Sequence, residues 1–291
     1  MPISLVIGGA VVGTALGGAN VTLTLPALQS GDVVYIAGGF NSFDDDPDVL
    51  TSGFTLLSSL FSVNANFGLW RKVMGIVPDA EVICLGQNGA GQSSGYAAFC
   101  LRGVDQTTSE DVATTSDFVS PGITTSPVNA PITTVTPSAW VLVFAGSVID
   151  DPDVTAPAGY GNQVNGSSGG VVPRFTIGAA TKNIALAGTE TPAGWGNWAN
   201  STWSAFTVAV RPADGGLLGA ASEAGLSGSV GDKGGYTIAP EFASPTKKRR
   251  PSPEPKGPSL FDLVKKQQQE QEEEDELLEL ITLIDTLENP L

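Results

Sequence analysis

Short apolar runs with a period of two dominate the first 212 residues of the chain. In NVTLTL, residues 20–25, the apolar Val21, Leu23 and Leu25 alternate with threonines, which is the pattern of a strand with one buried and one solvent-facing side. Other runs, such as VLVFAG at residues 141–146, are apolar throughout. These predict strands that are central in a sheet or lie at an oligomer contact.

Clusters of Gly, Pro, Asn and Asp separate these runs, and no segment with a helical period interrupts them before Pro212. The candidate strands span residues 20–25, 32–39, 54–59, 67–77, 81–86, 95–104, 131–137, 138–148, 173–180 and 201–212. This spacing predicts an all-β domain over residues 1–212, built as an antiparallel β-sandwich.

Composition changes after Pro212. Residues 213–258 hold 9 Gly and 6 Pro among 46 residues, a level typical of a flexible linker. This linker contains the basic cluster KKRR at residues 247–250, for which we weigh an electrostatic contact against an incidental run of charge.

Residues 259–291 predict an acidic, amphipathic helical tail. Ser259 followed by Asp262 is a helix start, and Pro290 ends the segment. Apolar side chains recur at spacings of three and four, as candidates for assembly contacts: Leu277, Leu280, Ile281, Ile284 and Leu287. The stripe fits two short amphipathic helices docked on a partner, a self-associating bundle, or, as a third alternative, a disordered acidic tail.

The formal charge of the chain is -16, from 14 Lys and Arg against 30 Asp and Glu. Because this charge repels polyanions, we expect neither specific nucleic-acid binding nor membrane association. The sequence contains no histidine, which excludes Ser-His-Asp and Cys-His nucleophile systems and His-ligated zinc. We therefore predict a protein that is not an enzyme and has no cofactor.

The N-terminal apolar segment has no Lys or Arg before Arg71, so we interpret it as mature structure and not as a secretory signal. The two cysteines, Cys84 and Cys100, lie inside strand-like apolar runs. We expect two buried free thiols rather than a disulfide.

The chain contains a partial repeat, with the two copies VVYIAGGFNSFDDDPDVLTSGF and VLVFAGSVIDDPDVTAPAGY. Each copy has an apolar strand, an Asp-rich turn and a Gly-aromatic pair. If the two turns lie together, their carboxylates make a candidate calcium site. The residues are Asp44, Asp45, Asp46, Asp48, Asp150, Asp151 and Asp153. The alternative is solvent-exposed Asp-Pro turns, and a further alternative function is a carbohydrate-active enzyme that uses acidic loop carboxylates.

Four aromatic residues lie amid Gly and Asn: Tyr160, Trp195, Trp198 and Trp203. Such rings serve as stacking platforms for sugars or as protein contacts, and we expect them to face outward. The alternative is that some of the tryptophans cap the sandwich core.

The strings SGDVVYIAGG, LWRKV, AAFCLRGVD, SAWVLVFAGSV and AFTVAVRP resemble the jelly-roll or concanavalin-like sandwich domains of tailed-bacteriophage virion proteins. These domains occur in tail fibres, receptor-binding proteins and head decorations. The resemblance covers residues 1–212 and implies a structural virion component on the particle surface, assembled in the host cytoplasm. Its implied partners are other virion proteins, further copies of itself, and a host surface glycan.

Overall fold

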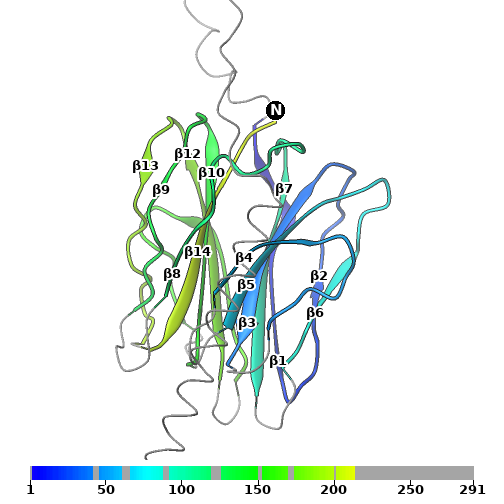
Figure 1. The fold of residues 1–291 in the computed structure, drawn as a ribbon, viewed down its shortest axis with the longest axis vertical. Coiled ribbons are helices and arrows are strands. Elements are labelled where there is room, and N and C mark those ends of the chain that lie inside the picture. Colours follow the sequence, from blue (N-terminus) through cyan, green and yellow to red (C-terminus); the bar gives the residue numbers. More distant parts are fainter. Residues whose placement is uncertain are drawn as a thin grey trace, which may run out of the picture. The chain divides into compact units, whose positions relative to one another are not determined.

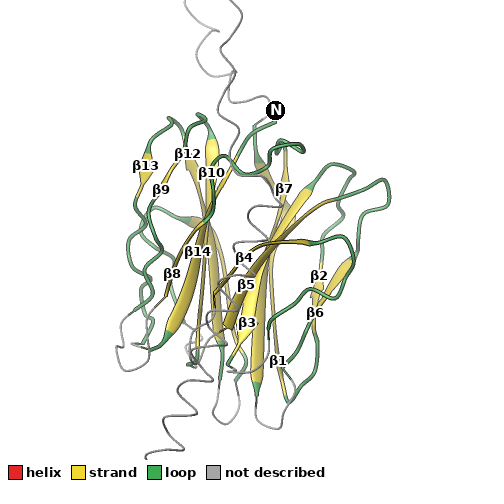
Figure 2. Cartoon of the chain, viewed as in Figure 1, coloured by secondary structure: helices red, strands yellow, loops and turns green. Residues whose placement is uncertain are grey.

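The structure is a computed structural model that describes residues 2–41, 46–60, 66–87, 92–118, 126–149, 153–169, 174–199 and 201–213. The chain separates into two compact units, Met1–Ser227 and Gly228–Leu291, and all described residues belong to the first. The predicted linker and tail therefore lie outside the described residues, apart from Ala213. Across the described ranges the regular secondary structure is β throughout, with antiparallel sheets (Figure 2).

The described residues form fourteen strands. They are β1 (Ser4–Leu16), β2 (Val21–Thr24), β3 (Val33–Phe40), β4 (Thr55–Leu60), β5 (Asn66–Val73), β6 (Glu81–Cys84), β7 (Ser93–Arg102), β8 (Thr115–Phe118), β9 (Ile132–Thr133), β10 (Ala139–Ser147), β11 (Gly161–Ser167), β12 (Thr176–Ile184), β13 (Thr189–Glu190) and β14 (Trp203–Val210). Within this part of the chain, no helix is long and apolar enough to cross a membrane.

Two five-stranded sheets pack face to face at the centre of the domain (Figure 1). The first has the strand order β1-β7-β3-β5-β4, and the second has the order β11-β12-β10-β14-β8. Their inner faces share one apolar core, in which Phe67 stacks on Phe206 at 5.3 Å between ring centroids and Phe99 lies 5.6 Å from Phe144. The prediction of an antiparallel β-sandwich is confirmed.

A thin outer layer covers the other face of each sheet. The β2–β6 ribbon lies over the first sheet and encloses a second apolar core around Trp70, while the β9–β13 ribbon helps enclose a third around Trp195. Because both faces of β3 and β10 are covered, these strands are buried along their whole length, apart from a partly exposed Trp140. The prediction that VLVFAG is central is therefore confirmed.

The domain consists of two halves with the same strand pairing. In residues 4–102 the first strand pairs with the last, and the pairing continues inward: β1 with β7, β2 with β6 and β3 with β5. Residues 115–210 repeat this order, with β9 paired to β13, β10 to β12 and β14 to β8. The partial sequence repeat thus belongs to a complete structural duplication.

An approximate two-fold axis along the strands relates the halves. β7 packs on β12 and β5 packs on β14, so exchanging the halves reproduces the contacts. Gly146, near the end of β10, lies against Phe67, and Phe67 pairs with Gly39, near the end of β3. The ends of the two central strands therefore lie at the same end of the domain, so β3 and β10 run in the same direction. We call the end at which β1 begins and β14 ends the termini end (Figure 1).

Candidate functional site

The described aspartates of the two Asp-rich turns lie on opposite faces of the domain. Asp48 precedes Val49, which bridges Cys84 in the outer layer of the first sheet. Asp153 precedes Val154, which belongs to the outer core of the second sheet. Because the two-fold axis relates the halves, the equivalent loops after β3 and β10 lie on opposite faces of the domain. Asp46 and Asp48 therefore do not form one cluster with Asp153. Among the described residues no group of three or more Cys, Asp or Glu could hold a metal ion.

The other four residues proposed for the calcium site lie outside the described residues: Asp44, Asp45, Asp150 and Asp151. The same is true of the five assembly candidates in the tail, Leu277, Leu280, Ile281, Ile284 and Leu287.

The three tryptophans of the predicted contact surface are buried. Trp195, Trp198 and Trp203 are 3%, 4% and 3% exposed and belong to the third apolar core. The expectation that these rings face outward is therefore wrong. Local composition suggested a polar loop, but the loop folds over the second sheet and presents its indoles inward.

The sheet beneath these rings is shaped to receive them. A Cβ atom at Gly178 of β12 would lie 2.8 Å from the Trp195 ring and 3.0 Å from the Trp198 ring. The two rings meet edge to face with centroids 5.4 Å apart, a favourable aromatic geometry.

Both indole N–H groups are satisfied inside the core: Trp195 donates to Asn129 Oδ1 at 2.8 Å, and Trp198 donates to Ser147 Oγ at 2.8 Å. Asn129 in turn donates to the backbone carbonyls of Phe144 and Phe206, on two neighbouring strands. The rings therefore have a structural role in holding the outer layer on the sheet.

Tyr160 is separated from the tryptophans. Its partner Lys182 pairs with Val141 at the start of β10, whereas Trp203 pairs with Ser147 at the other end of that strand. The half-buried phenol donates to Glu190 Oε1 at 3.3 Å, and Lys182 Nζ lies 5.6 Å from the ring centroid and 2.8 Å from Glu190. Burial and then the Glu190 carboxylate raise the pKa of Tyr160 above its ordinary value.

The first half contains the equivalent of this arrangement. Lys72 lies 5.4 Å from the Phe54 ring centroid and 2.6 Å from Asp79. Each ring follows a glycine with positive φ, Gly53 at 87° and Gly159 at 83°, a conformation that favours glycine. We name the sets clasp 1 (Phe54, Lys72, Asp79) and clasp 2 (Tyr160, Lys182, Glu190). The Gly-aromatic pair in each copy of the sequence repeat indicated the ring of each clasp, but the sequence did not predict the ion pairs.

The clasps should make similar contributions to stability. Replacing Lys72 or Lys182 by Met removes an ion pair and a cation–ring contact, and we expect each change to lower the free energy of unfolding by about 1 kcal/mol. The two effects should add, because the clasps lie on opposite flanks of the domain. Urea unfolding of the single and double variants measures this, and strong non-additivity would contradict independent clasps.

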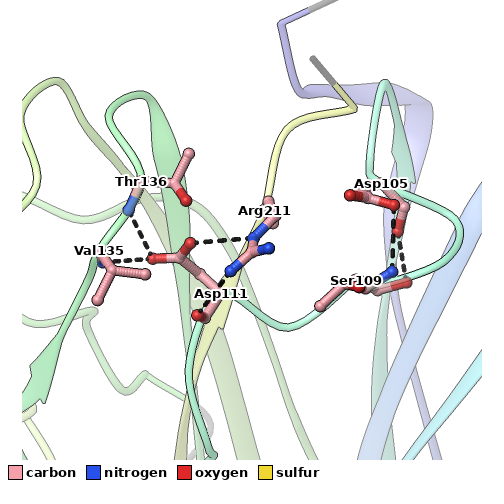
Figure 3. Close-up of polar contacts among 7 residues, drawn as sticks. Asp105, Ser109, Asp111, Val135, Thr136 and Arg211 are labelled. Atoms are coloured by element: carbon pink, nitrogen blue, oxygen red, sulfur yellow. Dashed lines mark hydrogen bonds and ion pairs between the residues drawn. The ribbon is translucent and has the colours of Figure 1, made fainter. Parts of the chain in front are cut away.

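A polar network fixes the connection between the halves (Figure 3). Asp111, whose side chain is fully buried, accepts from the backbone N–H groups of Val135 at 2.6 Å and Thr136 at 3.0 Å. Arg211 lies 3.3 Å from the same carboxylate. Burial opposes ionisation of Asp111, but the hydrogen bonds from Thr136, Val135 and Arg211 outweigh it and hold the pKa of Asp111 below its ordinary value.

The start of the same connection forms a tight turn. Asp105 Oδ1 accepts from the N–H groups of Thr107 and Thr108, and the carbonyl of Asp105 accepts from Ser109 Oγ at 2.8 Å. The N–H of Arg211 then donates to the carbonyl of Ser109. The turn thus pins the connection to the last strand of the domain.

Two further ion pairs at the termini end stabilise the first sheet. Glu110 accepts from Tyr35 Oη at 2.9 Å and from Arg71 at 2.6 Å, and Arg102 donates two hydrogen bonds to the buried Asp32. Burial, followed by Glu110, raises the pKa of Tyr35 well above its ordinary value. These charges join strands to loops, so their evident role is structural.

Cys84 and Cys100 are buried free thiols, as expected. Burial, with a smaller effect of Asp32, raises the pKa of Cys100 to about 12, and burial also raises that of Cys84. Thiols in this environment are poor nucleophiles at neutral pH.

Comparisons with protein-family models, with curated proteins and with solved structures found no match to this chain.

Proposed function

We propose that this protein is a non-enzymatic structural component of a tailed-bacteriophage virion. Its β domain is displayed on the particle surface, as a tail-fibre or receptor-binding module or as a capsid decoration, and its C-terminal tail attaches it. The protein assembles in the host cytoplasm with other virion proteins and with further copies of itself.

One observation carries this proposal: the chain enters and leaves the β domain at the same end. Ser4 of β1 pairs with Arg102, and Val104, two residues after Arg102, bridges Pro212, two residues after the end of β14. A segment attached after Pro212 therefore starts at the termini end. That arrangement suits a module held by one end and presented by the other.

The nested strand pairing supports a finer description of the fold. A jelly roll is a long hairpin wound on itself, so its first strand pairs with its last and its second with its second-to-last. Each half of this domain has that order, and we propose that each is a reduced jelly roll. We further propose that residues 213–258 are a linker and that residues 259–291 are helical.

The proposed contact with a host glycan no longer rests on the tryptophans, because their rings are buried. Of the four aromatic candidates, Tyr160 is the one with partial exposure, and its phenol is already bonded within clasp 2. A glycan contact therefore has to use other surface groups.

A test of attachment is to replace Ile281 and Ile284 together by Asp. If the stripe docks on the particle, losing two buried aliphatic side chains costs about 3–6 kcal/mol and should reduce incorporation by about a hundredfold or more. Quantitative mass spectrometry of purified particles measures the copy number, which also separates an abundant decoration from a fibre present in few copies. Thr282→Asp, which adds one negative charge off the stripe, is the control.

The proposal predicts normal incorporation of Thr282→Asp and a folded β domain in both variants. Full incorporation of the Ile281 and Ile284 variant would contradict attachment through the tail. Absence of the wild-type chain from purified particles would contradict the virion role itself.

A further inference from the structure

The two lateral sides of the sandwich differ, although the two-fold relation makes them equivalent. On one side the edge strands β1 and β11 pack together, with Gly166 of β11 against Val12 and Thr14 of β1. The equivalent side is formed by β8 and β4, the strands beyond β14 and β5. On this side the position equivalent to that of β1, a strand of thirteen residues, is held by β8, a strand of only four residues. We call this the β4–β8 side.

Large apolar side chains are exposed on the β4–β8 side. Leu56 of β4 is 52% exposed and Phe118 of β8 is 46% exposed. Leu57 and Leu60 of β4 are only partly buried against the central core. The β1 edge of this sheet also exposes large side chains, Ile7 and Leu16, but β1 packs against β11.

β4 also lacks the charged residues and prolines that often protect a sheet edge. Edge strands are commonly blunted by charged residues or proline, which discourage pairing with another chain. The stretch from Val49 to Trp70 contains no Asp, Glu, Lys, Arg or Pro. By contrast, β8 carries the exposed Asp117, and the edge strand β11 is polar. Both β4 and β11 have a register shift, which in β4 lies between Leu56 and Ser58.

We propose that β4 is a homodimer contact, at which β4 of one copy pairs antiparallel with β4 of a second copy. Charge favours this occupant: two copies of a strongly acidic chain repel at most surfaces, and β4 is an uncharged edge where they can approach. An antiparallel strand pair is self-complementary across a two-fold axis, which is the symmetry of most homodimers. The product is a ten-stranded sheet made of the two first sheets.

The contact gives the homo-oligomer of the proposed function a defined surface, and it can be tested without any particle. Leu56 and Ser59 pair with Trp70 and Gly68, whose outward sides face the outer layer, so both point away from the central core. Replacing both by Glu places like charges across the proposed axis while leaving the central core intact. We expect this variant to have half the mass of the wild-type assembly in sedimentation experiments on the full chain.

Leu186→Glu, which adds one such charge, is the control, because Leu186 is 79% exposed in the turn after β12, away from β4. It should leave the mass unchanged. Hydrogen exchange of the wild-type chain gives a second measurement: amides in residues 55–60 should become more protected as protein concentration rises.

A wild-type chain that stays monomeric would overturn the proposal. So would an unchanged mass in the Leu56 and Ser59 variant, an equal loss in Leu186→Glu, or concentration-independent exchange in β4. None of these results bears on attachment through the tail, so the two proposals can fail separately.

Discussion

Replacing Trp195 by Ala should lower the free energy of unfolding of the β domain by about 3–5 kcal/mol, the usual cost of removing a large core aromatic. The change empties part of the third core, removes the edge-to-face contact with Trp198 and leaves Asn129 Oδ1 without its donor. Urea unfolding followed by far-UV circular dichroism measures the loss.

Leu186→Ala is the control for this prediction, because removing an exposed leucine should change stability by less than about 0.5 kcal/mol. If Trp195→Ala keeps the wild-type stability, the ring does not occupy the core. A loss of ligand or host binding without a loss of stability would restore the interpretation as an exposed contact.

Replacing Asp111 by Asn should cost about 2–3 kcal/mol at pH 7, because Arg211 and two backbone N–H groups lose their carboxylate partner. The difference between wild type and variant should also depend on pH. The pKa of Asp111 is lower in the folded state than in the unfolded chain, so its contribution is complete above the unfolded pKa of about 4 and disappears as the pH falls through the folded pKa.

The measurement is the urea midpoint of both proteins from pH 7 to pH 2. The gap should be constant down to about pH 5 and narrow below about pH 4. Asp117→Asn, at an exposed position in β8, should show little effect at neutral pH. A gap between wild type and Asp111→Asn that persists unchanged at pH 2 would show that the carboxylate charge is not what stabilises the connection.

Two kinds of apolar run predicted strands correctly. The alternating run at residues 20–25 corresponds to β2, and the continuously apolar run at residues 138–148 corresponds to β10, each within one residue at each end. β11 was missed because GNQVNGS has no apolar alternation, and its place is set by pairing with β12. β1 was missed because its glycines and continuous apolar residues hide the alternation.

The candidate site was harder to predict because its contacts join residues far apart in the chain. The partner of Arg211 is Asp111, one hundred residues earlier, and no local spacing indicates it. The prediction that the tryptophan rings face outward was wrong for a related reason. Their neighbours are Gly and Asn, but the surface that buries them is supplied by Gly178 and Ser147 of other strands.

The separation of the two halves also sets the order in which the domain can form during synthesis. Every sheet pairing of the first half closes between residues 4 and 102, before the strands of the second half exist. Until the second half has been made, no second sheet covers the side chains of Phe67 and Phe99, which belong to the central core. At bacterial and eukaryotic translation rates the ribosome needs about 5–20 s to add the roughly 100 residues of the second half. During that interval the nascent chain presents a half-finished apolar surface to the cell.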